Sequence, residues 1–309
     1  MQSSSSRSKV ARLACLLISL SVLLVACGVA PSTLLNSAKG KLSVVGFNFP
    51  ESTVLVYLYA KPLAAKGYMV ETKPNLGTRE TLQPSLTSGQ VDMYLGYAAT
   101  DLEFVNKGAG EATSDIQVTL VRLRERYKAL GVDVLDAAPA VDKTAFAVTK
   151  PTADKYTLSR MSDLAAVGPQ LVLGGPPQCP QRPFCLPGLE RVYGIKFKDF
   201  KSLDVGGPLT KQALEAGEID VALVLSSDGA IPAKGFVILD DDKHLELSDN
   251  VVPMIRSAVN NAEITQILND VSAKLTTEDL ALLNKRNSID REEPEALAAE
   301  WLTAHGFAR

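Results

Sequence analysis

A ten-residue pattern that occurs twice constrains this chain more than any other feature. Residues 86–95 (LTSGQVDMYL) align with residues 214–223 (LEAGEIDVAL) at a constant offset of 128 positions. In each copy the end of a predicted helix is followed by a glycine, an acidic residue three positions later and a short apolar run. Such a run is typical of a buried strand in a parallel sheet, so the pattern predicts a helix–strand unit in each half of the chain.

The repeat has two interpretations. A helix, a glycine, an acid and a strand form a common connection in α/β proteins, so chance can produce the match. We favour the alternative, two α/β lobes that each offer one loop to a shared cleft. Ligands bind beyond the carboxyl ends of strands in open α/β sheets, and the loops in question are residues 97–100 and 226–228.

The order of the predicted elements supports an α/β fold. Strands are predicted at 42–47, 68–72 and 91–95 with helices between them, an order typical of a parallel sheet. Ser52 is the predicted cap of the first helix. Beyond the acidic run that ends at Asp242, helices are predicted at 262–275, 277–284 and 294–304. We expect these helices to return to the first lobe, so that two strands cross between the lobes as a hinge.

Residues 1–26 are predicted to be a lipoprotein signal peptide. Three basic residues precede an apolar run at 13–24 that is too short to span a bilayer. The segment ends in LVAC, which resembles a bacterial lipobox. The resemblance implies that Cys27 is lipidated and anchors the protein to the extracytoplasmic face of the cell membrane, with 27–41 as a tether. An ordinary secretory signal with an incidental cysteine is the alternative.

Charge argues against a nucleic-acid partner. Removal of the signal segment takes away three of the 32 basic residues and none of the 35 acidic ones, so the formal charge changes from −3 to −6. No basic block remains that could follow a phosphate backbone. No second apolar run approaches the length that spans a membrane.

Cysteine usage agrees with export. Apart from Cys15 and Cys27, the chain has only Cys179 and Cys185. In an oxidising compartment a pair six positions apart indicates a local disulfide. A metal site would need more ligands, and the two histidines, at 244 and 305, are far away in sequence. We therefore expect a structural disulfide and no metal.

Nothing in the sequence indicates catalysis. The chain has no G-x-S-x-G elbow, no H-E-x-x-H, no C-x-x-C and no phosphate-binding loop pattern. We expect no catalytic residue and no cofactor. Binding is better supported, because Tyr97 follows a predicted strand and an aromatic face can hold a cation. Arg182 lies between two prolines in the cysteine loop; it is a candidate partner for a ligand carboxylate or for a surface acid.

The chain resembles the substrate-binding lipoproteins of ABC importers for osmoprotectants, which are glycine betaine, choline, carnitine and proline betaine. The resemblance covers residues 42 to 307. It is carried by FPES at 49–52, NLGT at 75–78, the stretch from Gly89 to Thr100, Arg182 with PGL at 187–189 and YG at 193–194, GPL at 207–209, SDG at 227–229 and LDD at 239–241.

This resemblance implies a type II periplasmic-binding-protein fold with a ligand cleft and a two-strand hinge. We expect residues 42–142 plus 245–309 to form lobe 1 and residues 143–244 to form lobe 2. The family implies a monomer without enzymatic activity that closes on a small solute. It delivers the solute to a permease with cytoplasmic ATPase subunits.

The same resemblance implies the binding residues. Ser52, Tyr97 and Thr100 match ligand positions in the first lobe, and Arg182 matches a position associated with the ligand carboxylate. The full set of predicted ligand-binding residues is Phe49, Ser52, Tyr97, Thr100, Thr144, Phe146, Arg182, Lys211, Ser227 and Asp228.

The chain departs from the family where further tyrosines complete a cage for the ammonium group. It has Lys143-Thr144-Ala145 where the family often has Asn-Thr-Tyr, and it has Lys211 and Leu225 at two other positions. Each lost ring removes about 0.5–2 kcal/mol of attraction for a cation, and Lys211 would repel a cation if it faced the cleft. The solute is therefore betaine-like or a neutral or anionic polyol or phenolic compound.

A sensor and an enzyme are the two alternative functions. A lipoprotein that senses a ligand and signals to a partner would have the same sequence features. An enzyme on the same two-lobed fold, as in porphobilinogen-converting deaminases, needs a cofactor cysteine and a cytoplasmic location, and Cys27 argues against both.

Overall fold

Two five-stranded mixed sheets organise residues 39–247 and 249–307, which are the residues that the computed structural model describes. The first sheet has the order β2 (Met69–Gly77), β1 (Lys41–Phe47), β3 (Met93–Tyr97), β10 (Val251–Arg256) and β4 (Val132–Val134). The second has the order β7 (Asp199–Ser202), β6 (Val172–Gly175), β8 (Val221–Leu225), β5 (Thr144–Thr149) and β9 (Phe236–Ile238).

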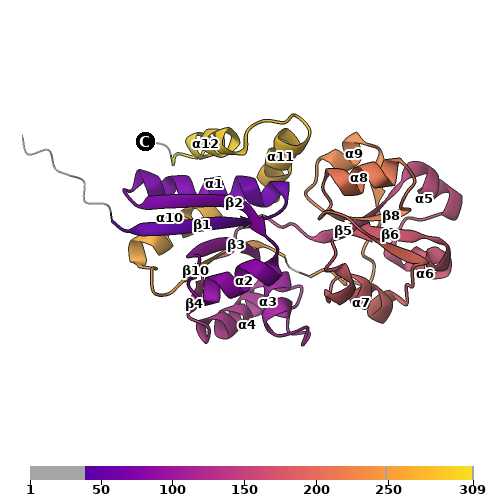
Figure 1. Cartoon of the computed structure of the whole chain (residues 1–309), viewed down its shortest axis with the longest axis horizontal. Helices are drawn as coiled ribbons and strands as arrows, with labels where there is room; N and C mark the ends of the chain where they lie inside the picture. The colour runs from indigo at the N-terminus through magenta and orange to yellow at the C-terminus, as the bar shows by residue number, and fades with distance from the viewer. Residues whose placement is uncertain (1–38, 248, 308–309) are drawn as a thin grey trace, which may run out of the picture. The chain divides into compact units, whose positions relative to one another are not determined.

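Each sheet and its helices form one α/β lobe (Figure 1). The first lobe has α1 (Pro50–Ala65), α2 (Arg79–Thr87), α3 (Ala98–Val105), α4 (Ile116–Lys128), α10 (Ala262–Ser272), α11 (Thr277–Ser288) and α12 (Pro294–Ala304). The second has α5 (Lys150–Tyr156), α6 (Leu164–Val167), α7 (Leu186–Gly188), α8 (Pro208–Glu215) and α9 (Ala230–Ala233). Short 3-10 turns lie at Met161–Asp163, Gly168–Gln170 and Cys179–Gln181, and a π-helical turn at Leu189–Tyr193.

The core of the first lobe brings the start of α1 close to the end of β1. All five residues of β3 and six of the seven in β1 are buried, as expected for strands covered on both faces. A Cβ atom at Gly46 would lie 2.8 Å from Cγ2 of Val56, so only glycine lets α1 pack this closely on β1. α1 also contacts α10, α11 and α12, which return to this lobe as predicted.

The sequence repeat has one structural role in both lobes. Gly89 and Gly217 follow α2 and α8 with φ values of 81° and 69°, in the left-handed region that favours glycine. Asp92 Oδ2 accepts a hydrogen bond from a backbone N–H of β1, and Asp220 Oδ2 accepts one from β6, each 2.9 Å long. The acid therefore fixes the start of the neighbouring parallel strand in each lobe, which confirms the prediction of two similar lobes.

Two antiparallel segments cross between the sheets. Val141 and Asn250 form an antiparallel bridge, and the backbone N–H of Asp142 donates to the carbonyl of Asp249 over 3.1 Å. The crossing segments are thus paired with each other, which agrees with the expected two-strand hinge.

The parallel pairing predicted for the first three strands is confirmed, because β1 pairs in parallel with both β2 and β3. Each sheet as a whole is mixed, because β10 runs antiparallel between β3 and β4 and β5 runs antiparallel to β8 and β9. The sequence did not predict β10, because Pro253 lacks an N–H and normally argues against a central strand. Two predictions about local structure were wrong. α1 begins at Pro50 with Phe49 as its N-cap residue, so Ser52 lies inside the helix. Tyr97 is the last residue of β3 and does not lie in the loop beyond it.

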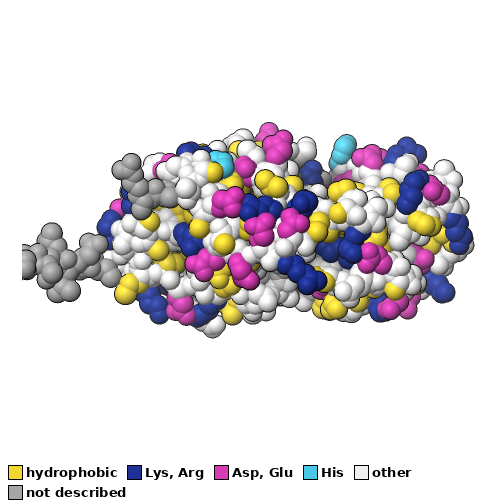
Figure 2. All heavy atoms as spheres, turned by 90° about the horizontal axis from the view of Figure 1, so that it is seen from above, with side chains coloured by type: hydrophobic (Ala, Val, Ile, Leu, Met, Phe, Trp, Pro, Cys, Tyr) yellow, Lys and Arg dark blue, Asp and Glu magenta, His cyan; other side chains and the backbone are white. Residues whose placement is uncertain are grey.

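Opposite charges are interspersed on the face shown in Figure 2. Among the ion pairs of the described residues, Arg286 bonds to both Glu292 and Glu300. Within the part of the chain that the structure describes, no helix is long and apolar enough to cross a bilayer.

Candidate ligand-binding site

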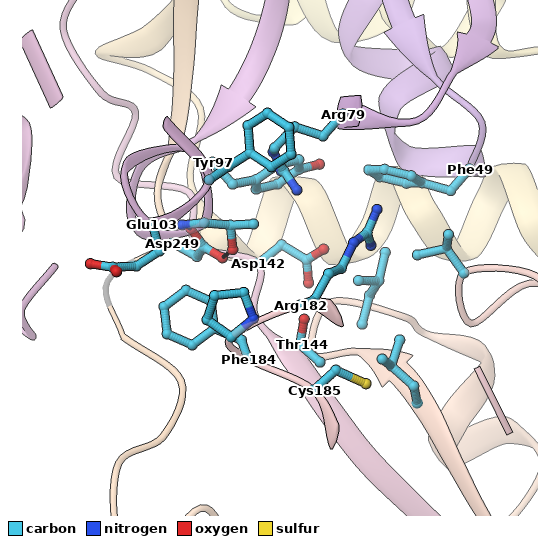
Figure 3. Close-up of a pocket in the computed structure, with 16 residues that line it drawn as sticks. Phe49, Arg79, Tyr97, Glu103, Asp142, Thr144, Arg182, Phe184, Cys185 and Asp249 are labelled. Carbon is cyan, nitrogen blue, oxygen red and sulfur yellow. Dashed lines mark hydrogen bonds between the residues drawn. The ribbon is translucent and has the colours of Figure 1, made fainter. Parts of the chain in front are cut away.

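A cavity of about 90 Å³ lies where the two lobes meet, with room for several water molecules. Its lining from the first lobe and the crossing segments is Phe49, Arg79, Tyr97, Thr100, Glu103, Phe104, Asp142 and Asp249. Its lining from the second lobe is Thr144, Arg182, Pro183, Phe184, Cys185, Val205, Leu223 and Leu225. Figure 3 shows this arrangement.

Aromatic rings form much of the cavity wall. Phe49 precedes α1 and stacks on Phe47, with ring centroids 5.8 Å apart and planes inclined by 9°. The ring centroid of Tyr97, at the end of β3, lies 6.1 Å from that of Phe49. Phe104 on α3 and Phe184 in the cysteine loop also line the cavity. Rings from both lobes thus surround one space.

Arg79 reaches the cavity from the start of α2. Its Nε donates to Oδ1 of Asp101 over 3.1 Å, and its guanidinium carbon lies 5.1 Å from the centroid of Phe47. The residue is only 8% exposed. Burial alone lowers the pKa of Arg79, but Asp101 and other neighbours outweigh burial, so the net shift of this pKa is upward. Arg79 is therefore a buried, permanently charged group at the cavity wall.

Arg182 joins the second lobe to the first. Its Nε and Nη2 atoms each donate to one carboxylate oxygen of Glu80 over 3.2 Å. Burial and the charge of Arg79 lower the pKa of Arg182, although Glu80 opposes them. The pair is a two-point salt bridge between the lobes, the geometry in which arginine binds a carboxylate most strongly.

Three carboxyl groups complete the polar lining. Asp249 accepts hydrogen bonds from the backbone N–H and the hydroxyl of Thr100, and burial raises its pKa to about 6. Glu103 accepts from the backbone N–H groups of Gly110 and Ala112, each over 2.7 Å. Burial raises the pKa of Asp142 well above its ordinary value, and the nearby Glu51 raises it further.

Glu51 lies behind the cavity and bonds to both lobes. Its Oε1 accepts from the hydroxyl of Tyr97, and its Oε2 accepts from Ser227 Oγ over 2.7 Å and from Asn284. The residue is 2% exposed, and burial raises its pKa. Glu51 therefore links a cavity residue to the second lobe.

Five of the ten predicted ligand residues line the cavity, namely Phe49, Tyr97, Thr100, Thr144 and Arg182. The other five lie outside this lining. Ser52 Oγ accepts from the backbone N–H of Phe47 over 2.8 Å, and Phe146 is fully buried in β5. Lys211 is 6% exposed and forms a salt bridge with Asp228.

Lys211, Ser227 and Asp228 line a second, smaller pocket next to Glu51. Asp228 therefore neutralises the charge of Lys211 in the second pocket. Lys211 is not among the residues that line the larger cavity.

Several lining residues were not predicted from the sequence, chiefly Arg79, Phe104, Phe184, Glu103 and Asp249. Phe184 had a usable signal, since it is two residues from Arg182 inside the cysteine loop. The others lack one, because their approach to the cavity depends on tertiary packing.

The predicted disulfide between Cys179 and Cys185 is confirmed, with Cα atoms 5.2 Å apart. It closes the loop that carries Arg182 and Phe184, so the bond restrains two lining residues. Cys15 and Cys27 lie outside the described residues. Within residues 39–247 and 249–307, no group of three or more acidic, histidine or cysteine side chains could hold a metal ion.

Known proteins resemble this chain in sequence and in structure. Residues 40–304 match the family described as the substrate binding domain of ABC-type glycine betaine transport systems. The glycine betaine-binding protein YehZ of Escherichia coli (strain K12) is 24% identical over 273 residues, which cover 84% of this chain and 88% of YehZ. The carnitine transport binding protein OpuCC of Listeria monocytogenes serotype 1/2a (strain 10403S) is 26% identical over 246 residues, or 78% of this chain and 79% of OpuCC.

The fold agrees with a solved structure. A crystal structure described as a glycine betaine/carnitine/choline ABC transporter superposes with a TM-score of 0.67 at 25% sequence identity. The match covers 86% of this chain and 99% of that one. The two-lobed architecture is therefore that of extracytoplasmic solute-binding proteins.

Proposed function

The chain belongs to the family of substrate-binding domains of ABC-type glycine betaine transport systems, and we propose that it binds a betaine-like solute between its lobes. The observation that carries this proposal is the composition of the cavity wall. Four aromatic side chains and two guanidinium groups line one small space. A quaternary ammonium group is attracted to aromatic faces, and a carboxylate pairs with a guanidinium. A zwitterion that carries both groups satisfies both parts of the wall.

Three structural features favour a betaine over an uncharged polyol or phenolic compound. Phe104 and Phe184 supply rings in addition to Phe49 and Tyr97, which offsets the tyrosines missing from the sequence. Lys211 is paired with Asp228 in the second pocket and does not oppose a cation in the cavity. Asp249 in the lining has a pKa of about 6, so it is ionised at neutral pH and adds negative potential that favours the ammonium end of the solute.

Binding is coupled to closure of the lobes in this proposal. The two lobes move as separate bodies about the paired crossing segments. Lobe 1 comprises residues 42–142 plus 245–309, and lobe 2 comprises residues 143–244. A solute that contacts both lobes binds the closed form more tightly and shifts the population towards it. The salt bridge between Glu80 and Arg182 and the bond between Glu51 and Ser227 stabilise that form.

The closed protein delivers its solute to an ABC permease that works with cytoplasmic ATPase subunits, and it takes part as a monomer without catalysing a reaction. Cys27 carries the lipid that holds the protein on the extracytoplasmic face of the membrane. This part of the proposal is supported by the lipobox-like LVAC sequence. Metabolic labelling with a radioactive fatty acid tests it: label is expected on the natural protein and is lost in Cys27→Ser, whereas label retained in that variant contradicts it.

A thermal-unfolding screen tests the solute class. Glycine betaine, carnitine and choline are compared with sorbitol and with a phenolic acid, using the purified protein. We expect the melting temperature to rise with one or more of the ammonium compounds and the rise to shrink in Tyr97→Ala. Stabilisation by sorbitol or the phenolic acid alone would mean that the cavity serves an uncharged or aromatic solute.

A further inference from the structure

Arg79 has an unoccupied donor edge at the cavity. Its only hydrogen bond to the described residues is the one from Nε to Asp101, so both Nη atoms lack a partner there. The residue is 8% exposed and lines the cavity. Neither Nη atom is among the fully buried side-chain atoms that lack a partner, so both are open to the cavity. An anion at the Nη edge would satisfy two donors at once.

Arg182 is differently placed. Both atoms of its Nε–Nη2 edge already bond to Glu80, across the boundary between the lobes. A solute carboxylate could take this edge only by displacing Glu80. Figure 3 shows the guanidinium ends of Arg79 and Arg182 directed into the space near Tyr97 and Phe49.

We propose that Arg79, and not Arg182, binds the acidic group of the solute, while Arg182 fastens the two lobes through Glu80. The assignment rests on the proposed function and names the group that sets its specificity. It reverses the expectation that the resemblance implied, in which Arg182 receives the ligand carboxylate. The pocket then selects solutes that carry a carboxylate or a similar planar anion beside the ammonium group.

The charges around Arg79 agree with this assignment. Asp101 holds Nε from behind the cavity and orients the guanidinium, so the Nη edge faces the solute as a preformed fork. The proximity of Arg79 also lowers the pKa of Arg182 beyond the effect of burial. An anion on Arg79 relieves this repulsion between the two guanidinium groups.

Calorimetric titration with glycine betaine and choline tests the assignment. The two compounds share a trimethylammonium group, but choline has a hydroxyl where glycine betaine has a carboxylate. We expect Arg79→Gln to lose about 10- to 100-fold in affinity for glycine betaine, and at least tenfold more than it loses for choline. Arg79→Lys should lie between the natural protein and Arg79→Gln, because lysine keeps the charge but not the fork.

Two further variants separate binding from stability. Arg182→Gln should weaken both compounds by a similar factor, because it breaks the contact between the lobes. Arg256→Gln removes an arginine that bonds to Asp92 outside the cavity and should leave the ratio of the two affinities unchanged. If Arg79→Gln does not fold, Arg79→Lys and Arg182→Gln still show which arginine binds the carboxylate, because only that arginine's variant changes the ratio of the affinities for glycine betaine and choline.

The proposal is overturned if Arg182→Gln, rather than Arg79→Gln, weakens glycine betaine selectively, or if Arg79→Gln weakens both compounds equally. Binding of neither compound by the natural protein would count against the proposed solute class instead. Malonate then serves as the probe: stabilisation of the natural protein that disappears in Arg79→Gln supports the anion site. No stabilisation of the natural protein by malonate overturns it.

Discussion

Ser227 of the second lobe donates a hydrogen bond to Glu51 of the first over 2.7 Å, and both side chains are buried. The same carboxylate accepts a hydrogen bond from Tyr97, which lines the cavity. Tyr97, a cavity-lining residue, and Ser227 of the second lobe therefore bond to the same carboxyl group. We infer that Glu51 couples occupation of the cavity to closure.

A double-mutant cycle measures this contact. Glu51→Ala and Ser227→Ala are each made alone and together, and the free energy of unfolding is determined in urea. We expect a coupling energy of about 1–3 kcal/mol, because the bond is buried and one partner is a carboxylate. A coupling energy near zero would mean that the two side chains act independently of each other.

Phe184 is expected to contribute to solute binding through its ring. Phe184→Leu keeps an apolar side chain but removes the aromatic face, which should weaken binding of an ammonium compound by about 2- to 30-fold. Phe200→Leu in β7 is the matched control, since Phe200 packs against the core and does not line the cavity. Equal affinities in the two variants would exclude a role for the Phe184 ring.

Asp249 is expected to make stability depend on pH. Burial raises its pKa to about 6, so the folded state holds this proton more tightly than the unfolded state does. The resulting stabilisation is fully present below about pH 4 and is lost as the pH rises through 6, by about 3 kcal/mol. Relative to Asp249→Asn, the natural protein should therefore become less stable between pH 4 and pH 7.

Urea unfolding of both proteins across this range checks the prediction. Asp270→Asn, which changes an exposed residue of α10, serves as the control. A difference in unfolding free energy between Asp249→Asn and the natural protein that stays constant with pH contradicts it.

The disulfide is expected to stabilise both the fold and the site. Replacement of Cys179 and Cys185 by serine opens a short loop and should lower the free energy of unfolding by about 2 kcal/mol. Solute affinity should also fall, because the loop carries Arg182 and Phe184 into the cavity. Chemical denaturation and calorimetry of the double variant measure the two effects. Unchanged affinity would show that the loop keeps its conformation without the bond.

Local signals in the sequence predicted the features that depend on local chemistry. The repeated glycine and acid at Gly89 and Asp92 predicted a helix end and a strand start. Glycine is favoured where the backbone is left-handed, and the acid can accept a hydrogen bond from the neighbouring strand. The short spacing of the two cysteines likewise predicted the disulfide. β10 was not predicted because it contains Pro253, which normally argues against a central strand. The strand forms through pairing with β3, which is far away in the chain.

The candidate site was harder to predict from the sequence than the fold. Tyr97, Arg182 and Phe49 were found because they follow strands or lie in a restrained loop. Arg79 starts an ordinary helix, and nothing in its neighbourhood signals that its guanidinium reaches a cavity. Lys211 was expected to be a possible obstacle to a cation, but its pairing with Asp228 follows from a contact that no local pattern encodes.

A crystal structure of the protein with glycine betaine tests directly whether a charged solute is held between the lobes. We expect one molecule in the cavity, with its trimethylammonium group against the rings of Tyr97 and Phe184 and its carboxylate on the Nη edge of Arg79. Glycine betaine bound elsewhere on the protein, with the cavity between the lobes left unoccupied by it, would contradict this expectation.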